Sequence, residues 1–166
     1  MSGQAAKNVV TDPPQISVVK SITVELGVRE AFDFFTQQAV DWWPRRHQVV
    51  AGDREVIVFQ PRRDGRWYER ASDGAEADWG RVLLWNPPYR LAATWRIGGR
   101  WQLLPDDDGA SEIEVVFIPD GADRTVIRLT HRGLERLGEH AGSMRAALDL
   151  PGPGDTLGCY AAALRQ

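Results

Sequence analysis

The spacing of apolar residues changes once near the start of the chain. Within Ile16–Leu26, every second residue is apolar except Lys20, and this alternation predicts a half-buried strand with one charged exception. Within Val28–Pro44, apolar residues instead recur at helical spacing, which predicts an amphipathic helix that is broken near Thr36 and stopped by the proline.

Six further segments are short, rich in β-forming residues and separated by turn-forming residues. They cover residues 54–61, 65–71, 79–85, 89–97, 111–119 and 124–132. Beyond Gly133 the pattern becomes helical again, is interrupted by PGPGD, and resumes at residues 156–166, with Asp155 as the expected N-cap. Residues 1–14 are small and polar and predict a disordered lead-in, whereas residues 15–166 predict a single domain.

This order of elements predicts an α+β fold. Strand, helix, six strands and helix give a seven-stranded antiparallel sheet in meander order, and the terminal helix is left to cover one face of the sheet. A curved sheet around a helix leaves a space between them, so we expect an internal cavity.

Composition narrows the classes of partner. The chain has 166 residues, of which 43% are hydrophobic and 26% charged, and its net charge is −3 with the basic residues dispersed along the sequence. We therefore expect a globular protein that binds neither nucleic acid nor an anionic membrane. With one cysteine, Cys159, no apolar run long enough to span a bilayer and no apolar signal-peptide core, the chain is expected in the cytoplasm.

Several segments resemble a known family. They are VREAFDFFT, GRWYERASDGAEADWGRVLLWNPPYRLAATW and SEIEVVFIPDGADRTVIRLTHRGLE. Together they are similar to the homologues of the activator of the ninety-kilodalton heat-shock chaperone's ATPase, which are small bacterial members of the START-like (SRPBCC) superfamily. The resemblance implies a helix-grip fold, in which seven curved strands surround the C-terminal helix and a cavity. Members of the superfamily bind sterols, lipids, hormones or polyketides, and a few catalyse cyclisation.

Strand alternation assigns the aromatic residues to faces of the sheet. Trp67 shares an inward face with Glu69. Trp95 shares an inward face with Leu91, Ala93 and Ile97. Trp79 and Trp85 alternate with the inward positions, so they are predicted to cover the outer face or an edge.

Nine side chains are predicted to contact a ligand: Phe35, Trp43, Trp67, Glu69, Ala93, Trp95, Phe117, His131 and Tyr160. Glu69 and His131 are the ionisable members of this set. A buried carboxylate needs a partner, so Glu69 should meet His131, an arginine or a tryptophan N–H. The histidines have no metal-ligand spacing, and we expect neither a metal nor a cofactor.

Three functions remain open at this point. The first is a binding protein that holds a small hydrophobic or amphipathic molecule in its cavity, with Glu69 and His131 as a polar anchor. The second is an enzyme of the polyketide-cyclase type that uses the same pair, and the third is a chaperone-type interaction module with an exposed aromatic surface. A lined cavity of about 300 Å³ or more favours the first two, and a filled interior favours the third. The sequence does not indicate the oligomeric state.

Overall fold

The structure is a computed structural model that describes residues 15–44, 47–150 and 155–165. The predicted disordered lead-in, residues 1–14, lies outside the described residues. The strands are β1 (Val18–Val24), β2 (Arg54–Phe59), β3 (Arg66–Ala71), β4 (Glu76–Asn86), β5 (Arg90–Trp95), β6 (Ser111–Pro119) and β7 (Thr125–Arg132). The helices are α1 (Val28–Gln37), α2 (Ala39–Trp42), the 3-10 helix η1 (Leu134–His140), α3 (Ala141–Asp149) and α4 (Thr156–Leu164).

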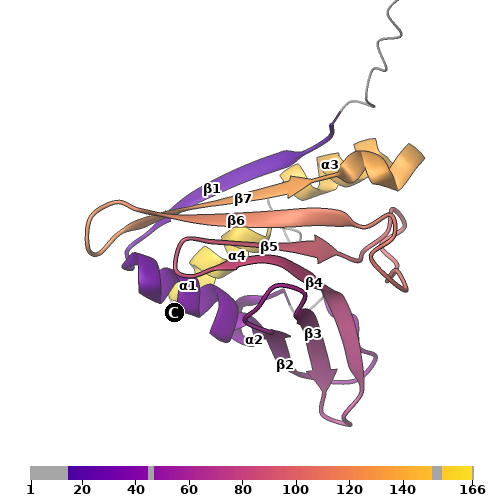
Figure 1. The fold of residues 1–166 in the computed structure, drawn as a ribbon, viewed down its shortest axis with the longest axis horizontal. Helices are drawn as coiled ribbons and strands as arrows, with labels where there is room; N and C mark the ends of the chain where they lie inside the picture. The colour runs from indigo at the N-terminus through magenta and orange to yellow at the C-terminus, as the bar shows by residue number, and fades with distance from the viewer. Residues whose placement is uncertain (1–14, 45–46, 151–154, 166) are drawn as a thin grey trace, which may run out of the picture.

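All seven strands form one antiparallel sheet in the order β1-β7-β6-β5-β4-β3-β2. The first strand of the chain therefore pairs with the last, and β2 to β7 follow each other as a meander (Figure 1). Helix α4 lies behind the sheet in this view, while α1 and α2 lie along its lower side. This is the helix-grip arrangement that the order of elements predicts, and it places α4 against the inner face.

The predicted helix breaks are confirmed within a few residues. α1 ends at Gln37, the capping residue Gln38 has a φ of −116°, and the short α2 follows at once. At the other end of the chain, the Asp155 side chain accepts a hydrogen bond of 3.1 Å from the amide of Gly158 and caps α4. The buried residues of α4 are Leu157 and Tyr160, whose hydroxyl donates to the carbonyl of Ala31 at 2.8 Å.

The prediction that Trp79 and Trp85 cover the outer face is wrong. Two irregularities in the pairing of β4 reverse the alternation, one at Trp79 itself and one between Val82 and Leu84. Each extra residue turns the side chains that follow it to the opposite face. Trp79 is consequently 3% exposed within the core, and Trp85 packs edge-on against Phe32 at 5.3 Å.

Gly80 makes the first irregularity sterically allowed. A Cβ atom at this position would lie 1.9 Å from the carbonyl oxygen of Thr94 on β5. Only glycine permits the two backbones to approach this closely, and the Thr94 hydroxyl also accepts a 2.8 Å bond from the amide of Arg81. The Trp-Gly pair in the sequence thus specifies a bulge that turns an indole inward.

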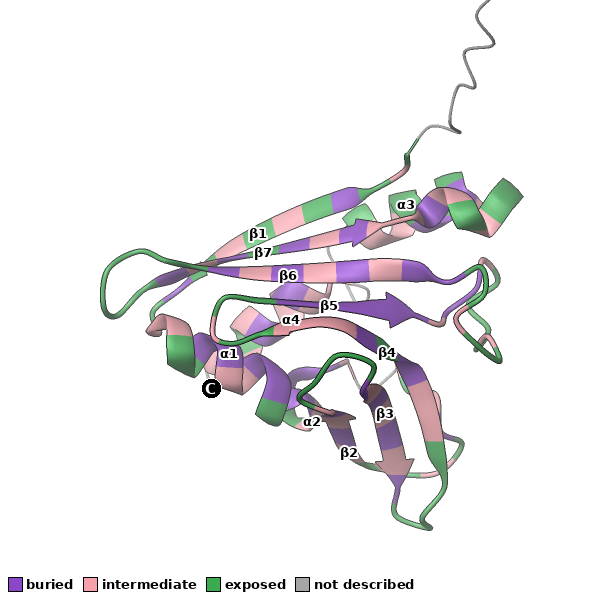
Figure 2. Cartoon of the chain, in the orientation of Figure 1, coloured by how far each residue is buried: buried purple, intermediate pink, exposed green. Residues whose placement is uncertain are grey.

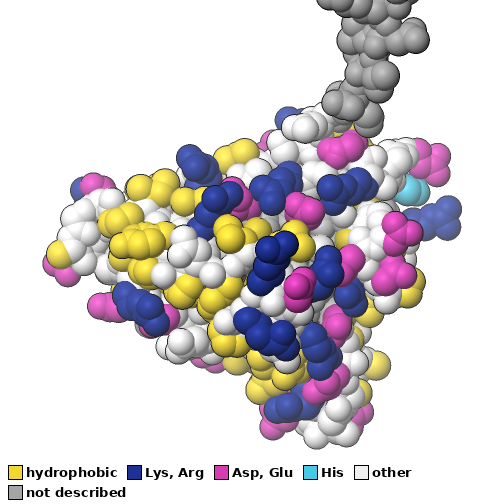
Figure 3. Space-filling view, viewed as in Figure 1, with side chains coloured by type: hydrophobic (Ala, Val, Ile, Leu, Met, Phe, Trp, Pro, Cys, Tyr) yellow, Lys and Arg dark blue, Asp and Glu magenta, His cyan; other side chains and the backbone are white. Residues whose placement is uncertain are grey.

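The two faces of the sheet differ in character. Buried and partly exposed residues alternate along β6 and β7 (Figure 2), and the inward residues join the core with α1 and α4. Arginine and acidic side chains are intermixed on the outer face (Figure 3), where Arg132 contacts Glu112 at 3.0 Å and Glu114 at 3.2 Å. Among the described helices, none is long and apolar enough to cross a membrane.

Candidate functional site

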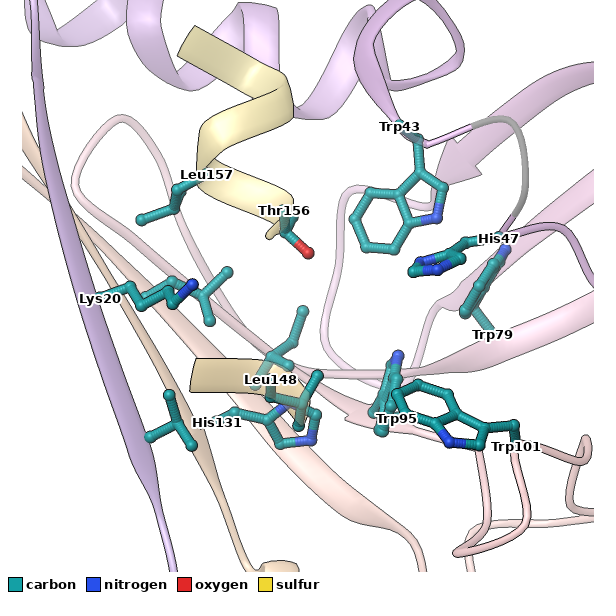
Figure 4. A pocket seen from close by; sticks show the side chains of 13 residues that line it. Lys20, Trp43, His47, Trp79, Trp95, Trp101, His131, Leu148, Thr156 and Leu157 are labelled. Atoms are coloured by element: carbon teal, nitrogen blue, oxygen red, sulfur yellow. The ribbon is translucent and has the colours of Figure 1, made fainter. Parts of the chain in front are cut away.

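A cavity lies between the inner face of the sheet and the start of α4 (Figure 4). Its volume is about 40 Å³, and we call it the inner cavity. Its lining residues are Val18, Lys20, Trp43, His47, Trp79, Trp95, Trp101, Ile113, Leu129, His131, Leu148, Thr156 and Leu157. An adjoining cleft of about 380 Å³, the outer cleft, is lined by His47, Gln48, Val49, Trp79, Trp95, Ile97, Trp101 and Leu103.

The two spaces share four aromatic walls, namely His47, Trp79, Trp95 and Trp101. The inner cavity is far below the roughly 300 Å³ of a typical small-molecule site, whereas the outer cleft exceeds that size. A ligand of several rings therefore fits only if its bulk lies in the outer cleft and one edge enters the inner cavity.

A cluster of tryptophans forms the wall on the β3–β4 side. Trp67 and Trp79 stack with ring centroids 5.7 Å apart and an interplanar angle of 20°. Trp43 meets both rings edge-on, at 5.5 Å from Trp67 and 5.3 Å from Trp79. The indole N–H groups of all three are buried and have no hydrogen-bond partner among the described residues. Trp43 and Trp79 line the inner cavity, while Trp67 lies behind them.

Trp101 stands at the mouth of the outer cleft. It is 50% exposed and meets the Trp95 ring edge-on at 6.2 Å. Its backbone has a φ of 61°, the left-handed region that bulky residues seldom adopt. The loop between β5 and β6 therefore holds a large flat side chain over the site in a conformation that costs free energy.

His131 lies on the inner face of β7. Its Nε2 atom forms a 2.7 Å hydrogen bond with the Ser111 hydroxyl, and its ring meets Trp95 edge-on at 4.4 Å. Within the described part of the chain, no other hydrogen bond engages the ring. Burial lowers the pKa of His131 from 6.5 to about 3, which keeps the imidazole uncharged at neutral pH.

Two further polar side chains line the inner cavity. The Lys20 ammonium donates to the carbonyl of Leu150 at 3.2 Å and lies 3.4 Å from the Asp155 carboxylate. On the opposite side, burial and then the charge of Arg54 lower the pKa of His47, so this imidazole is also uncharged at neutral pH. Lys20 is the one charged residue in the apolar alternation of the first strand. This exception was the only feature of the sequence that singled out Lys20.

Glu69 holds the segment that carries Trp43 and His47. One carboxylate oxygen accepts hydrogen bonds from the amides of Val49 and Val50, the latter at 2.9 Å, and the other lies 3.3 Å from the Arg54 guanidinium. Arg54 in turn donates to the carbonyls of Trp43 at 3.1 Å and His47 at 2.9 Å. Of the three predicted partners of Glu69, the arginine is the one found.

A Glu69–His131 pair is not formed, which corrects the prediction that the two act together. β3 presents Glu69 to the segment before β2, whereas β7 presents His131 to the inner cavity on the far side of the tryptophan cluster. Glu69 does not line the inner cavity or the outer cleft. Its carboxylate is fully occupied by backbone amides and Arg54.

The other predicted site residues separate into two groups. Trp43, Trp95 and His131 line the inner cavity. Phe35, Trp67, Ala93, Phe117 and Tyr160 belong to the hydrophobic core behind it. Contact with a ligand stays a prediction for all of them. Sequence alternation missed Trp79 because of the bulge, and it missed His47 and Trp101 because both lie in loops.

No group of three or more His, Cys, Asp or Glu side chains that is suited to a metal ion occurs among the described residues. The polar groups that face the inner cavity are instead indole and ammonium donors, one hydroxyl and two uncharged imidazoles. Such a set suits an uncharged or anionic organic ligand that carries oxygen atoms.

Comparison with known proteins places the chain in a family. Residues 27–149 match the family described as Activator of Hsp90 ATPase homolog 1-like protein. The chain belongs to this family. The match runs from the residue before α1 to the end of α3, and so includes six of the seven strands. No curated protein matches the chain.

Solved structures that are similar to this chain include a synthase and a resistance protein. The anthrahydroquino-gamma-pyrone synthase Txn09, complexed with SUM, is 47% identical over 89% of this chain and 96% of its own, with a TM-score of 0.62. The self-sacrificing resistance protein CalC from Micromonospora echinospora is 27% identical over 90% of this chain and 95% of its own, with a TM-score of 0.65. Protein MLL2253 from Mesorhizobium loti, 16% identical over 90% of this chain and 96% of its own with a TM-score of 0.60, shares the fold.

Proposed function

We propose that this protein binds a planar, polycyclic aromatic polyketide across the outer cleft and the inner cavity, and that it closes an oxygen heterocycle on that ligand. The observation that carries the proposal is the aromatic wall of the site, formed by Trp43, Trp79, Trp95 and Trp101. Flat indole surfaces favour stacking with flat aromatic rings. The 47% identity to a gamma-pyrone synthase supports the same class of ligand.

The proposed reaction is a cyclodehydration. A phenolic hydroxyl on the ring system attacks the distal carbonyl carbon of a neighbouring diketone side chain, forming one C–O bond and a cyclic hemiketal. The phenolic proton leaves as the carbonyl oxygen gains one, and loss of this new hydroxyl with a proton from the adjacent carbon releases one water and leaves the pyrone. These two steps require no oxidant or reductant. They need only a proton acceptor, a proton donor and a fixed geometry of the reacting groups.

Two uncharged imidazoles are suited to move these protons. His131 lines the inner cavity, Ser111 holds its Nε2 atom at 2.7 Å, and Nδ1 has no hydrogen-bond partner among the described residues. His47 lies between the two spaces and lines both. Because burial lowers the pKa of each histidine, both rings are uncharged at neutral pH and each keeps one nitrogen that can accept a proton. We assign His47 to the attacking hydroxyl, since it is nearer to solvent and can pass a proton onward, and His131 to the orientation of the bound ring.

The alternatives fit the geometry less well. A polyketide cyclase that uses Glu69 lacks its base, because the carboxylate is occupied by Arg54 and two amides. A chaperone-type module was to be favoured by a filled interior; the inner cavity holds only about 40 Å³, but the outer cleft beside it, at about 380 Å³, exceeds the size expected of a ligand site. A protein that binds the ligand without catalysis would use the same site. The turnover measurement described below distinguishes this alternative from the proposed enzyme.

The test uses an anthrahydroquinone that carries a diketone side chain beside a phenolic hydroxyl, incubated without oxygen. We expect loss of one water, followed by mass spectrometry, at a rate about 10²-fold or more above the protein-free rate, as for one positioned acid or base. His47→Gln should lower the turnover rate by about 10²-fold. The control His140→Gln, on a histidine outside both spaces, should leave it unchanged. Tight binding with ring closure at the protein-free rate would show that the protein is a carrier and refute the catalytic proposal.

A further inference from the structure

Lys20 is a charged residue on the inward side of β1. The other residues on this side of the strand are apolar, namely Val18, Ile22 and Val24, and all three pack in the core. The Lys20 side chain is only 20% exposed. Holding an ammonium at such a position costs free energy unless other groups compensate its charge.

The described part of the chain compensates this ammonium only in part. Lys20 donates one hydrogen bond, of 3.2 Å, to the carbonyl of Leu150. Its Nζ atom also lies 3.4 Å from the Asp155 carboxylate oxygen that accepts from the amide of Gly158. This distance is long for a hydrogen bond between charged groups, which usually measures about 2.7–2.9 Å. Because an ammonium carries three N–H donors, Lys20 keeps donors for a further acceptor.

Lys20 and Thr156 point into the inner cavity from two of its walls. Figure 4 shows the Lys20 nitrogen and the Thr156 oxygen directed toward the middle of the space, the first from β1 and the second from the start of α4. The Thr156 hydroxyl has no hydrogen-bond partner among the described residues and is not one of their buried unpaired atoms, so it is accessible. Asp155 does not line the cavity. The cavity therefore meets the positive partner of the ion pair.

Lys20 carries the one charge among the described side chains that line the inner cavity. The two histidines in this lining, His47 and His131, are uncharged at neutral pH because burial lowers the pKa of each. A positive charge in a confined and largely apolar space attracts an anion more strongly than it does in water. With about 40 Å³, the cavity has room for one small oxygen-bearing group.

We propose that Lys20 and Thr156 form an anion subsite in the inner cavity, which binds an ionised oxygen of the ligand such as that of a carboxylate, phenolate or enolate. The placement of the ligand's rings in the outer cleft rests on the proposed function, whereas the subsite follows from these two donors. During the proposed loss of water, removal of the proton beside the ketone places negative charge on the ketone oxygen, and Lys20 stabilises that charge. The subsite thus selects ligands with an acidic group at one edge.

The test compares two probes of matched shape, 2-naphthoate and 2-naphthamide. Both have the same planar rings, but the first ends in a carboxylate and the second in an uncharged amide. Their dissociation constants are measured by calorimetry at neutral pH with the full chain. We expect naphthoate to bind about tenfold more tightly, as for one hydrogen bond to a charged group. Lys20→Met keeps the length of the side chain without its charge and should reduce this preference to about twofold or less.

Substitutions at the ion pair separate binding from a structural role of Lys20. Asp155→Asn keeps a residue that caps α4 but removes the negative charge beside Lys20, so the preference for naphthoate should rise about threefold or more. The double variant Lys20→Met/Asp155→Asn should bind the two probes about equally. If Lys20 only anchored α4, either single substitution would weaken both probes alike. Thr156→Val should weaken naphthoate about threefold through loss of the hydroxyl donor.

Arg145→Met is the matched control for the loss of a positive charge. Arg145 on α3 also contacts β1's approach, through a 3.3 Å hydrogen bond to the carbonyl of Ser17, but it lines neither the inner cavity nor the outer cleft. The preference for naphthoate should therefore persist in this variant.

Nuclear magnetic resonance on the unaltered protein gives a readout that does not depend on how a variant folds. The sequence contains two lysines, Lys7 and Lys20, so lysine-selective isotope labelling gives two side-chain signals. The signal that is lost in Lys20→Met identifies Lys20. We expect naphthoate to shift this signal and naphthamide to leave it in place.

Equal affinity for the two probes, binding of neither probe, a lower preference in Asp155→Asn, or an unmoved Lys20 signal would each overturn the subsite. The proposed function fails separately. A clear preference for naphthoate without turnover of the diketone substrate keeps the anion subsite and removes the catalytic proposal. Turnover without any preference removes the subsite and keeps the catalytic proposal.

Discussion

Replacing Glu69 by alanine should destabilise the protein by about 3–5 kcal/mol, because the substitution breaks a buried ion pair and leaves its partners behind. The side chain is fully buried, and the Arg54 side chain is only 5% exposed. The amides of Val49 and Val50 lose their acceptor as well, at a cost of about 1–3 kcal/mol for each donor left unpaired. These losses overlap, since the emptied site relaxes, so we do not expect their full sum.

Glu69→Gln separates the contribution of the ion pair with Arg54 from that of the hydrogen bonds with the amides of Val49 and Val50. The amide oxygen can still accept from Val49 and Val50, but the charge opposite Arg54 is gone, so we expect a smaller loss of about 1.5–3 kcal/mol. Urea unfolding followed by tryptophan fluorescence gives the free energy of unfolding of each variant. A double-mutant cycle with Arg54→Met should show a coupling energy of at least about 2 kcal/mol.

Asp33→Ala serves as the control, because it removes an ion pair with Arg29 at 3.2 Å on the surface of α1. Its expected effect is below about 0.5 kcal/mol. A Glu69→Ala variant within about 1 kcal/mol of the unaltered protein would refute the argument that Glu69 holds the segment of Trp43 and His47. A coupling energy near zero would show that Arg54 is satisfied without the carboxylate.

Three further substitutions test other parts of the structure. The pKa of His131 is 6.5 in the unfolded chain, and burial lowers it to about 3 in the folded protein. The stability that comes from keeping this imidazole uncharged is therefore complete above pH 6.5 and is lost as the pH falls toward 3. Between pH 7 and 5 this group should cost about 2 kcal/mol, so the decline measured by urea unfolding should be smaller by about that amount in His131→Gln than in His140→Gln, with the part due to His47 remaining in both; an equal decline in the two variants would contradict the assignment. Gly80→Ala should lower stability by more than about 3 kcal/mol, because its Cβ would lie 1.9 Å from the Thr94 oxygen, and a melting temperature close to that of the unaltered protein would rule out the bulge. Trp101→Gly relieves the φ of 61° and should change stability by less than about 1 kcal/mol, while calorimetry should show at least fivefold weaker binding of sulfonated anthraquinone; unchanged affinity would remove Trp101 from the site.

The fold and much of the core follow from local patterns. Alternation along β1, β6 and β7 and the helical spacing before Pro44 predict elements that the structure contains, because each pattern reflects which side of one element is buried. The inward placement of Trp67 and Trp95 follows in the same way. The charged Lys20 within an apolar alternation correctly marked an unusual position, though not its place in a cavity.

The site itself was decided by tertiary structure. Trp79 faces inward because the backbones of β4 and β5 approach closely at Gly80, a contact between segments that alternation within one strand does not register. Glu69 pairs with Arg54, not with His131, because the sheet order places β2 beside β3 and β7 four strands away from β3. The periodicity of a sequence shows which side of one helix or strand is buried. A site depends on the distances between side chains of different elements, and only the packing of the sheet and helices fixes these distances.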